Sequence, residues 1–246
     1  MAGEFARAAT GFAARTQGRF DDLDVVGFAR LSGGEAVLEV GVGAGEFLTR
    51  FEGVAGRLVG ADITFEMLSA ARARHPAIEL IMADGARLPL ADGCIDLAGS
   101  AQMLHHVRRP VPMVVEMRRV VAPSGRVLIV DQVASERYEE AIAMTELETI
   151  RDPSHAASRP PSALRMIVRA AGLEIIDERI VSGRQRLSEW MWPGEFPEER
   201  IEAVRDFIAH HGDATGMEFK REGDDWAFTR RRMMALAAKP PPTGDN

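Results

Sequence analysis

The chain has 246 residues, 46% of them hydrophobic and 27% charged, which is typical of a globular protein with a sizeable core and argues against disorder. Its formal charge of −7 argues against a nucleic-acid partner, because such proteins normally carry a basic face. No apolar run reaches the roughly 20 residues of a membrane span, no signal-peptide pattern opens the chain, and the single cysteine provides neither a disulfide nor a zinc site, so a cytoplasmic protein without membrane contact is expected.

Two helices are predicted before the first strand. Apolar residues from Phe5 to Ala13 recur at helical spacing, and a second helical segment runs from about Asp22 to Arg30, before Gly33-Gly34 breaks the chain. Residues 1–32 are therefore expected to form a helical lid over one edge of the following domain.

From residue 33 onward, short apolar strands alternate with amphipathic helices. Strands are predicted at 37–40, 57–62, 78–82, 95–99 and 126–131. Helices are predicted from the glycine-rich turn through residue 48, at 65–74 and at 111–121, with a turn at 123–125. This alternation is typical of a parallel sheet that has helices on both faces.

The pattern weakens after residue 131. Helices at 138–150, 162–171 and 198–210 and a strand at 173–181 are expected, and residues 225–238 fit either a last strand or, in their second half, a helix. We therefore predict an α/β fold with a doubly wound, mostly parallel seven-stranded sheet of Rossmann-like type over residues 33–240. Residues 183–224 are expected to form a lid or substrate segment, and residues 241–246 a disordered tail.

Glycines and acidic residues follow the first three strands, where open α/β sheets bind ligands. Gly41, Gly43 and Gly45 follow the first strand, and glycine lets the backbone approach a ligand closely. Asp62 ends the second strand about 20 residues later, where a carboxylate can accept hydrogen bonds from ribose hydroxyls. Asp84 follows the third strand, where it can meet an adenine amino group. Together these residues predict a cofactor that contains a nucleoside.

The sixth position counted from Gly41 bears on the choice of cofactor. A dinucleotide fingerprint has a small residue there, but this chain has Glu46, whose charge opposes a pyrophosphate at a helix N-terminus. Acidic residues at positions 39, 62 and 84 tolerate a cationic cofactor without phosphates. S-adenosylmethionine, with its sulfonium and α-amino group, fits both requirements.

Seven segments, in this order, resemble the motifs of class I S-adenosylmethionine-dependent methyltransferases. They are VLEVGVGAG (37–45), GADITFEML (60–68), DGARLPL (84–90), DGCIDL (92–97), LHHV (104–107), EMRRV (116–120) and PSGR (123–126). Within that family the chain is most similar to the small-molecule branch that includes ubiquinone- and menaquinone-biosynthesis enzymes of bacterial-type metabolism. The resemblance covers about residues 33–131.

The resemblance implies roles for nine cofactor-binding residues. Gly41 and Gly43 would line the methionine part, Glu39 would buttress that loop, Asp62 would hold the ribose, Ile63 and Met67 would lie near the adenine, Asp84 and Ala86 would bind the adenine edge, and Ser100 would lie beside the sulfonium. No metal is predicted, because no carboxylate cluster supports one.

A general base is needed only when the acceptor must lose a proton, since the protein's main task in methyl transfer is alignment. His105, His106 and His155 are candidates because histidine titrates near neutrality. His105 follows the fourth strand and is our first choice, with His155 as the other catalytic candidate. A structural role for the His105-His106 pair stays open.

Three other features have a functional and a structural interpretation. Trp190 and Trp192 fit either a cover over an apolar substrate or a core contact. Cys94 fits a small buried hydrophobe better than a reactive thiol. The run Arg230-Arg231-Arg232 fits a solvated face better than an anion site.

We therefore expect an S-adenosylmethionine-dependent methyltransferase that methylates an oxygen, nitrogen or carbon atom of a small-molecule metabolite and releases S-adenosylhomocysteine. Two alternatives remain: a cofactor-binding scaffold or cyclase without methyl transfer, and a nicotinamide-dependent oxidoreductase, which Glu46 disfavours. Ser100-Ala101-Gln102 after the fourth strand, instead of an Asn/Asp-Pro-Pro-aromatic run, argues against nucleic-acid methylation. The sequence leaves open the acceptor and whether the protein is a homodimer.

Overall fold

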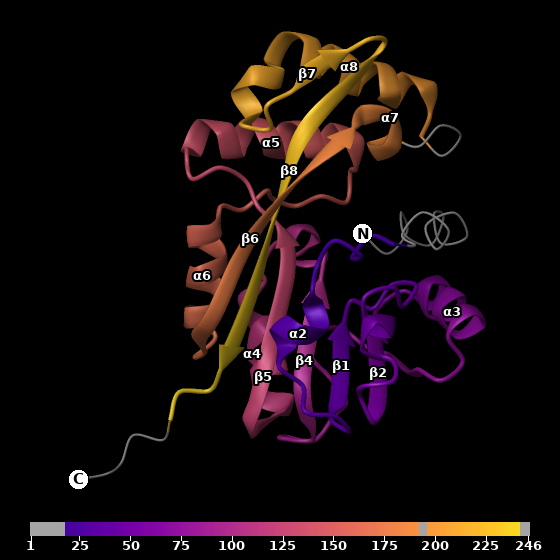
Figure 1. The fold of residues 1–246 in the computed structure, drawn as a ribbon, viewed down its shortest axis with the longest axis vertical. Helices are drawn as coiled ribbons and strands as arrows, with labels where there is room; N and C mark the ends of the chain where they lie inside the picture. Colours follow the sequence, from indigo (N-terminus) through magenta and orange to yellow (C-terminus); the bar gives the residue numbers. More distant parts are fainter. Residues whose placement is uncertain (1–17, 192–195, 242–246) are drawn as a thin grey trace.

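The computed structural model describes residues 18–191 and 196–241. Within them, the central sheet has the strand order β3-β2-β1-β4-β5-β8-β6, and a short β7 pairs with β8 (Figure 1). The strands are β1 (Ala36–Val40), β2 (Arg57–Asp62), β3 (Glu79–Met82), β4 (Ile95–Ala101), β5 (Val121–Gln132), β6 (Glu174–Arg186), β7 (Lys220–Glu222) and β8 (Asp225–Ala238). Neighbours from β3 to β5 pair in parallel, whereas β8 is antiparallel to β5 and β6. The expected mostly parallel α/β sheet is confirmed.

Both faces of the sheet are covered, which the alternation of side chains along the strands allows. On β5, Val127 and Ile129 face one core, into which α4 (Val111–Val120) and α6 (Pro161–Ala170) pack. Leu128 and Val130 face the other core. That second core includes residues of α2 (Val25–Ala29), α3 (Phe65–Arg74) and the 3-10 helix η1 (Leu48–Phe51).

A third, separate core builds a cap beyond the carboxyl ends of the parallel strands (Figure 1). The cap comprises α5 (Tyr138–Arg151), α7 (Leu187–Trp190), α8 (Glu198–His211), the 3-10 helix η3 (Gly212–Thr215), β7 and the adjoining ends of β6 and β8. Residues 183–224, expected to form a lid, thus lie mostly in the cap, together with α5. Trp190 is buried in the core of the cap, as its structural interpretation predicts, and Trp192 lies outside the described residues.

Several predicted elements differ from the structure. The α-helix expected after the glycine-rich turn is wrong, because turns and the four-residue η1 take its place. The helix expected from Asp22 to Arg30 is shortened to α2, and the one from Phe5 to Ala13 lies outside the described residues. The turn expected at 123–125 lies within a β5 irregularity, where the register moves from Ile95–Val121 to Leu97–Arg126.

Two ambiguities of the sequence are also settled. Residues 225–238 form a strand throughout, so the helical alternative for their second half is wrong. The short strand β7, which pairs with this strand, was not predicted. Cys94 is exposed rather than buried, because it follows Gly93, which has a positive φ of 67°, in the turn that precedes β4.

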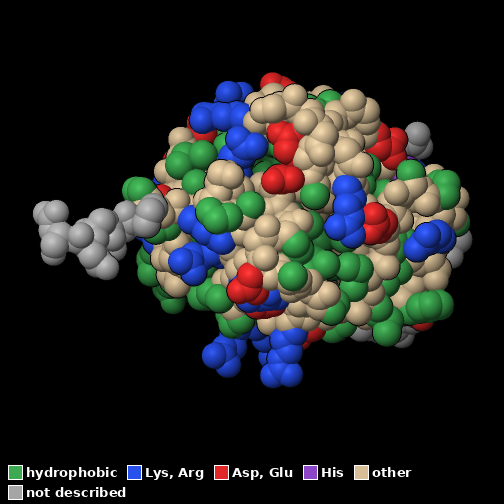
Figure 2. All heavy atoms as spheres, turned by 90° about the horizontal axis from the view of Figure 1, so that it is seen from below, with side chains coloured by type: hydrophobic (Ala, Val, Ile, Leu, Met, Phe, Trp, Pro, Cys, Tyr) green, Lys and Arg blue, Asp and Glu red, His purple; other side chains and the backbone are tan. Residues whose placement is uncertain are grey.

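The surface opposite the cap is mixed in character. On the face seen in Figure 2, acidic, hydrophobic and neutral groups separate the lysine and arginine side chains into several groups. In the two described stretches of chain, no helix combines the length and apolarity that crossing a membrane would require.

Candidate functional site

The carboxyl ends of the parallel strands border two adjoining cavities. The larger, which we call the main cavity, has about 940 Å³ of empty space, part of it open to solvent, and is also lined by Arg19 from the N-terminal side and by Arg151 and Asp152 at the end of α5. The smaller, the side cavity, has about 560 Å³ and extends to Asp84 and the residues that follow it. Four residues line both cavities: Gly41, Asp62, Ile63 and Met103. The two cavities are therefore neighbouring parts of one site.

The glycine-rich loop after β1 packs tightly against the end of β2. Gly41 and Gly43 have positive φ values of 81° and 51°, a region that favours glycine. A Cβ on Gly41 would lie 2.6 Å from the Cγ of Met103. The Gly43 N–H donates a hydrogen bond of 3.0 Å to Oδ2 of Asp62. The loop therefore needs glycine at position 41 both for its backbone conformation and for space.

Asp62 is held in place at the junction of the two cavities. Its Oδ1 accepts a hydrogen bond of 2.8 Å from the Thr64 N–H, while its Oδ2 accepts from Gly43. Burial raises the pKa of the Asp62 carboxyl, and these backbone donors offset part of that effect. Since each carboxylate oxygen can accept more than one hydrogen bond, Asp62 keeps capacity for a ligand hydroxyl.

Glu39 is a buried carboxyl without a full set of partners. The residue is 2% exposed, and its Oε2 has no hydrogen-bond partner in the described parts of the chain. Burial raises the pKa of Glu39 well above its ordinary value, although a hydrogen bond with the Leu48 backbone lowers it. The contact with Leu48 agrees with the expected support of the loop, and a cationic ligand in the main cavity would stabilise the ionised form.

Most of the predicted site residues gather around these two cavities. The main cavity is lined by Glu39, Gly41, Gly43, Asp62, Ile63, Met67, His105 and His106, and the side cavity by Asp84 and Ala86. Two predicted residues line neither cavity. Ser100 is buried in β4 with its Oγ unpartnered among the described residues, and His155 lies behind the cavity wall, where its Nε2 is 3.0 Å from the Ser158 Oγ.

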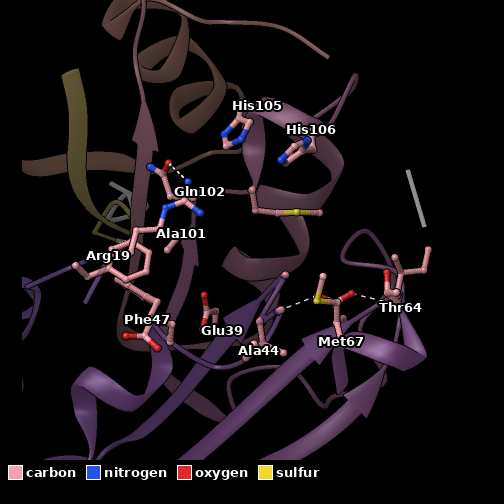
Figure 3. A pocket seen from close by; sticks show the side chains of 18 of the residues that line it. Arg19, Glu39, Ala44, Phe47, Thr64, Met67, Ala101, Gln102, His105 and His106 are labelled. Carbon is pink, nitrogen blue, oxygen red and sulfur yellow. Dashed lines mark hydrogen bonds between the residues drawn. The ribbon is translucent and has the colours of Figure 1, made fainter. Parts of the chain in front are cut away.

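The three histidines form a cluster at one end of the main cavity. The ring centroids of His105 and His106 are 4.1 Å apart, and those of His105 and His155 are 5.4 Å apart. In Figure 3, His105 and His106 lie together at one end of the pocket, whereas Thr64 and Met67 lie at the other. The cluster therefore lies apart from the end of β2.

A carboxylate fixes the orientation of His105. The Nδ1 atom of His105 lies 2.5 Å from Oδ1 of Asp131, and its backbone N–H donates a bond of 3.0 Å to Oδ2 of the same residue. Burial lowers the pKa of His105 well below its ordinary value, and burial raises the pKa of Asp131 to about 6. At neutral pH the imidazole is therefore neutral, with its proton on Nδ1 toward Asp131 and a lone pair on Nε2.

Two arginines that the motifs did not identify meet at Gln102, which lines the main cavity together with Arg19 but not with Arg230. Arg19 and Arg230 both donate to Oε1 of Gln102, at 2.9 and 2.6 Å, and Figure 3 shows Arg19 beside Gln102. Arg232 is buried and forms an ion pair with Asp22. The interpretation of Arg230-Arg231-Arg232 as a solvated face is therefore wrong for the first and third members. Strand periodicity is the signal that places positions 230 and 232 on one face.

No group of three or more His, Cys, Asp or Glu side chains that could hold a metal ion occurs in residues 18–191 and 196–241.

Comparisons with known proteins agree with this geometry. Residues 38–129 match a family model described as a methyltransferase domain. Over 182 residues the chain is 26% identical to the uncharacterized methyltransferase YcgJ of Bacillus subtilis, covering 72% of each chain. Over 98 residues it is 30% identical to a demethylmenaquinone methyltransferase of Renibacterium salmoninarum, covering 40% of this chain and 41% of that protein.

The crystal structure of YcgJ superposes with a TM-score of 0.78 at 21% identity and covers 88% of this chain and 96% of that one, which shows a common fold. Other curated relatives are matched over a smaller part, and the chain spans 30% and 39% of the length of two of them.

Proposed function

We propose that this chain is a class I S-adenosylmethionine-dependent methyltransferase, which transfers a methyl group from that cofactor to an oxygen, nitrogen or carbon atom of a small-molecule acceptor; the match of residues 38–129 to a methyltransferase domain supports this. The observation that carries the proposal is the joined pair of cavities, which brings Asp84, Asp62 and Glu39 into one site with His105. This site has room for a nucleoside at one end and for an acceptor at the other.

The residues of this chain fit the cofactor group by group. Asp62 would accept from the ribose hydroxyls, Asp84 and Ala86 would bind the adenine edge in the side cavity, and Ile63 and Met67 would pack near the base; these residues line the two cavities. The orphaned Oε2 of Glu39 fits a cationic cofactor, because an ionised carboxylate that is buried needs a positive partner. When bound, the cofactor supplies an electrophilic methyl group on a sulfonium; after transfer of the methyl group, the sulfur is left as a neutral thioether.

Glu46 also favours this cofactor over a dinucleotide. It lines the main cavity beside the glycine-rich loop, where its carboxyl accepts a hydrogen bond of 2.8 Å from the Gly18 N–H. An acidic group at this place opposes a pyrophosphate but tolerates a sulfonium compound.

His105 is the group that we assign to accept a proton from the acceptor. Its ring lines the main cavity, and Asp131 fixes the tautomer in which Nε2 carries the lone pair. Asp131 is a positioning residue, since it acts through His105 and does not line the cavity. The same logic of a carboxylate that orients a histidine base operates in other enzymes that activate a hydroxyl.

Calorimetry with S-adenosylhomocysteine tests the cofactor assignment. We expect stoichiometric binding to the intact protein and a Kd at least tenfold weaker for Asp62→Asn. The matched control is Asp206→Asn, which removes an exposed carboxylate of α8 and is expected to leave the Kd unchanged. Failure of the wild-type protein to bind would refute the proposal.

Transfer itself is tested by incubating the protein with isotope-labelled S-adenosylmethionine and a panel of small phenols, amines and carboxylic acids. Mass spectrometry should detect a labelled product together with S-adenosylhomocysteine. Cofactor binding without label transfer to any member of the panel would instead favour a scaffold or cyclase that binds the cofactor without transferring its methyl group.

A further inference from the structure

Two guanidinium groups, one in the wall of the main cavity and one outside its lining, share a neutral partner in that wall. Arg19 and Arg230 both donate to the amide oxygen of Gln102, and Arg230 also lies 3.2 Å from Oε1 of Gln132. Burial lowers the pKa of Arg19 to about 9 and that of Arg230 to about 10. The charge of Arg230 also lowers the pKa of Arg19, whereas the charge of Glu148 raises that of Arg230. Neither guanidinium forms an ion pair with a carboxylate in the described chain.

The acidic residues nearby are already engaged with other groups. Asp22 pairs with Arg232, Glu148 pairs with Arg151 at 2.7 Å, and Asp131 accepts from His105. The two half-buried cations therefore have amide oxygens as their hydrogen-bond acceptors, while the charges of Asp131 and Glu148 act on them without an ion pair. Such an arrangement costs free energy, because a partly desolvated charge is stabilised fully only by an opposite charge.

Hydrogen-bond donors also outnumber acceptors at this wall. Gln102 is 8% exposed and Gln132 is 2% exposed, and the amide nitrogen of each has no acceptor among the described residues. The Nε atom of Arg230 is likewise buried without a partner in that part of the chain. Gln102 itself adopts a positive φ of 51°, an uncommon conformation for a residue with a side chain. Buried donors are normally paired, so the missing component is an acceptor with several lone pairs and a negative charge.

We propose that the acceptor substrate carries an oxyanion, a carboxylate or a phosphate, which binds to Arg19 and Gln102 in the wall of the main cavity, where Arg230 supports Gln102 from outside the lining. This inference rests on the proposed function, since the acceptor would share the main cavity with the cofactor. Arginine suits this task because its planar donors match the oxygens of carboxylates and phosphates.

The position of this wall also orients the acceptor. Arg19, Gln102 and His105 line the same cavity, and Figure 3 shows Arg19 and Gln102 on one side with His105 and His106 at the adjoining end. An acceptor anchored by its oxyanion at Gln102 would present the remainder of the molecule to the region between His105 and the glycine-rich loop. The anchor therefore provides the alignment on which methyl transfer depends.

Calorimetric titration with three probes tests the inference. Benzoate, phenyl phosphate and the neutral benzamide are titrated into the full chain, with and without saturating S-adenosylhomocysteine, at low salt. We expect at least one anion to bind at least tenfold more tightly than benzamide, and the tighter anion identifies carboxylate or phosphate recognition. Equal affinity for benzamide, or no binding of either anion, would overturn the inference.

Arg230→Met should weaken anion binding at least tenfold and leave the Kd of S-adenosylhomocysteine within twofold. The matched control is Arg184→Met, because Arg184 is exposed on β6 and pairs with Glu222. If Arg230→Met weakens S-adenosylhomocysteine binding instead, the arginines serve the cofactor's own carboxylate and the inference is wrong. Failure of S-adenosylhomocysteine to bind the wild-type protein would refute the proposed function, and the anion titration without it would still decide the present inference.

Gln102→Glu provides a second test that does not depend on how Arg230→Met folds. The new carboxylate would lie where Arg19 and Arg230 already donate, so it should act as an internal anion. We expect a higher midpoint of thermal unfolding and at least tenfold weaker binding of the anionic probe. Unchanged anion affinity in this variant would contradict the assignment of the wall.

Discussion

A buried ion pair within α5, at the end of the helix that borders the main cavity, gives a prediction that does not depend on the identity of the acceptor. Glu148 is 1% exposed, and its carboxylate accepts hydrogen bonds of 2.9 and 2.7 Å from Arg151, whose guanidinium lies 4.6 Å from the centroid of the Trp190 ring. Although burial alone would raise the pKa of Glu148, the charges of Arg151, His155 and Arg230 lower it from 4.5 to about 2.

The magnitude follows from that pKa. At 1.36 kcal/mol per pKa unit, a carboxyl whose pKa falls from 4.5 to about 2 stabilises the folded state by about 3 kcal/mol at neutral pH. Because the pKa in the folded state is the lower one, this stabilisation is complete above the unfolded pKa of 4.5 and is lost as the pH falls through about 2. Glu148→Gln should therefore lower the free energy of unfolding by about 3–5 kcal/mol at pH 7, since it leaves Arg151 buried without its partner.

Urea denaturation at several pH values measures this effect. The matched control is Glu146→Gln on the same helix, where the side chain is exposed, and its effect should stay within about 0.5 kcal/mol. The difference between wild type and Glu148→Gln should shrink to about 2 kcal/mol at pH 3.5. Equal effects of the two substitutions at pH 7, or a difference that does not change with pH, would refute the reasoning.

Three further predictions concern the proposed cofactor site, the backbone conformation of two glycines, and the proposed base. Asp62→Asn should weaken S-adenosylhomocysteine binding about 10–100-fold in calorimetry, because hydrogen bonds to a charged group contribute about 1.5–3 kcal/mol; an unchanged Kd would remove Asp62 from the site. Gly53→Ala, at a φ of 78° with open space around it, should cost about 1–2 kcal/mol of stability in urea denaturation, whereas Gly41→Ala should cost more and also weaken cofactor binding. For an acceptor that must lose a proton, kcat/KM should fall below about pH 6, where Asp131 takes up a proton and no longer holds the His105 proton on Nδ1; Asp131→Asn should shift this limb, and a profile that is the same in both proteins would exclude His105 as the base.

The sequence locates the part of the site that we propose for the nucleoside, because its signals are local. Gly41, Asp62 and Asp84 each follow a strand that the apolar pattern identifies, and a parallel sheet brings the carboxyl ends of its strands to one edge. The same locality explains a failure. The pattern near Leu48 predicts a helix, but three turn-forming glycines precede it, and only a 3-10 turn forms there.

The cationic wall could not be predicted in this way. Arg19, Gln102 and Arg230 come from three distant parts of the sequence, and each is unremarkable among its neighbours. The decisive fact is that β8 inserts between β5 and β6 and carries Arg230 to the end of the sheet near the cap. The sequence fits both a strand and a partly helical segment at residues 225–238. The direction in which the Arg230 side chain points could therefore not be predicted.

The insertion of β8 also bears on how the molecule forms during synthesis. Strands β1 to β5 leave the ribosome first and can pair with one another, but β6 cannot dock beside β5, because the gap between them belongs to a strand made more than 30 residues later. Until then β5 presents an open edge, which is the kind of surface that recruits other chains or chaperones. Arg232 of β8 donates to the carbonyl of Arg19, 213 positions earlier, so this contact can form only after β8 has been made. A nascent chain that has not reached residue 225 lacks β8 and Arg230, and at that stage the open edge of β5 would need protection from aggregation.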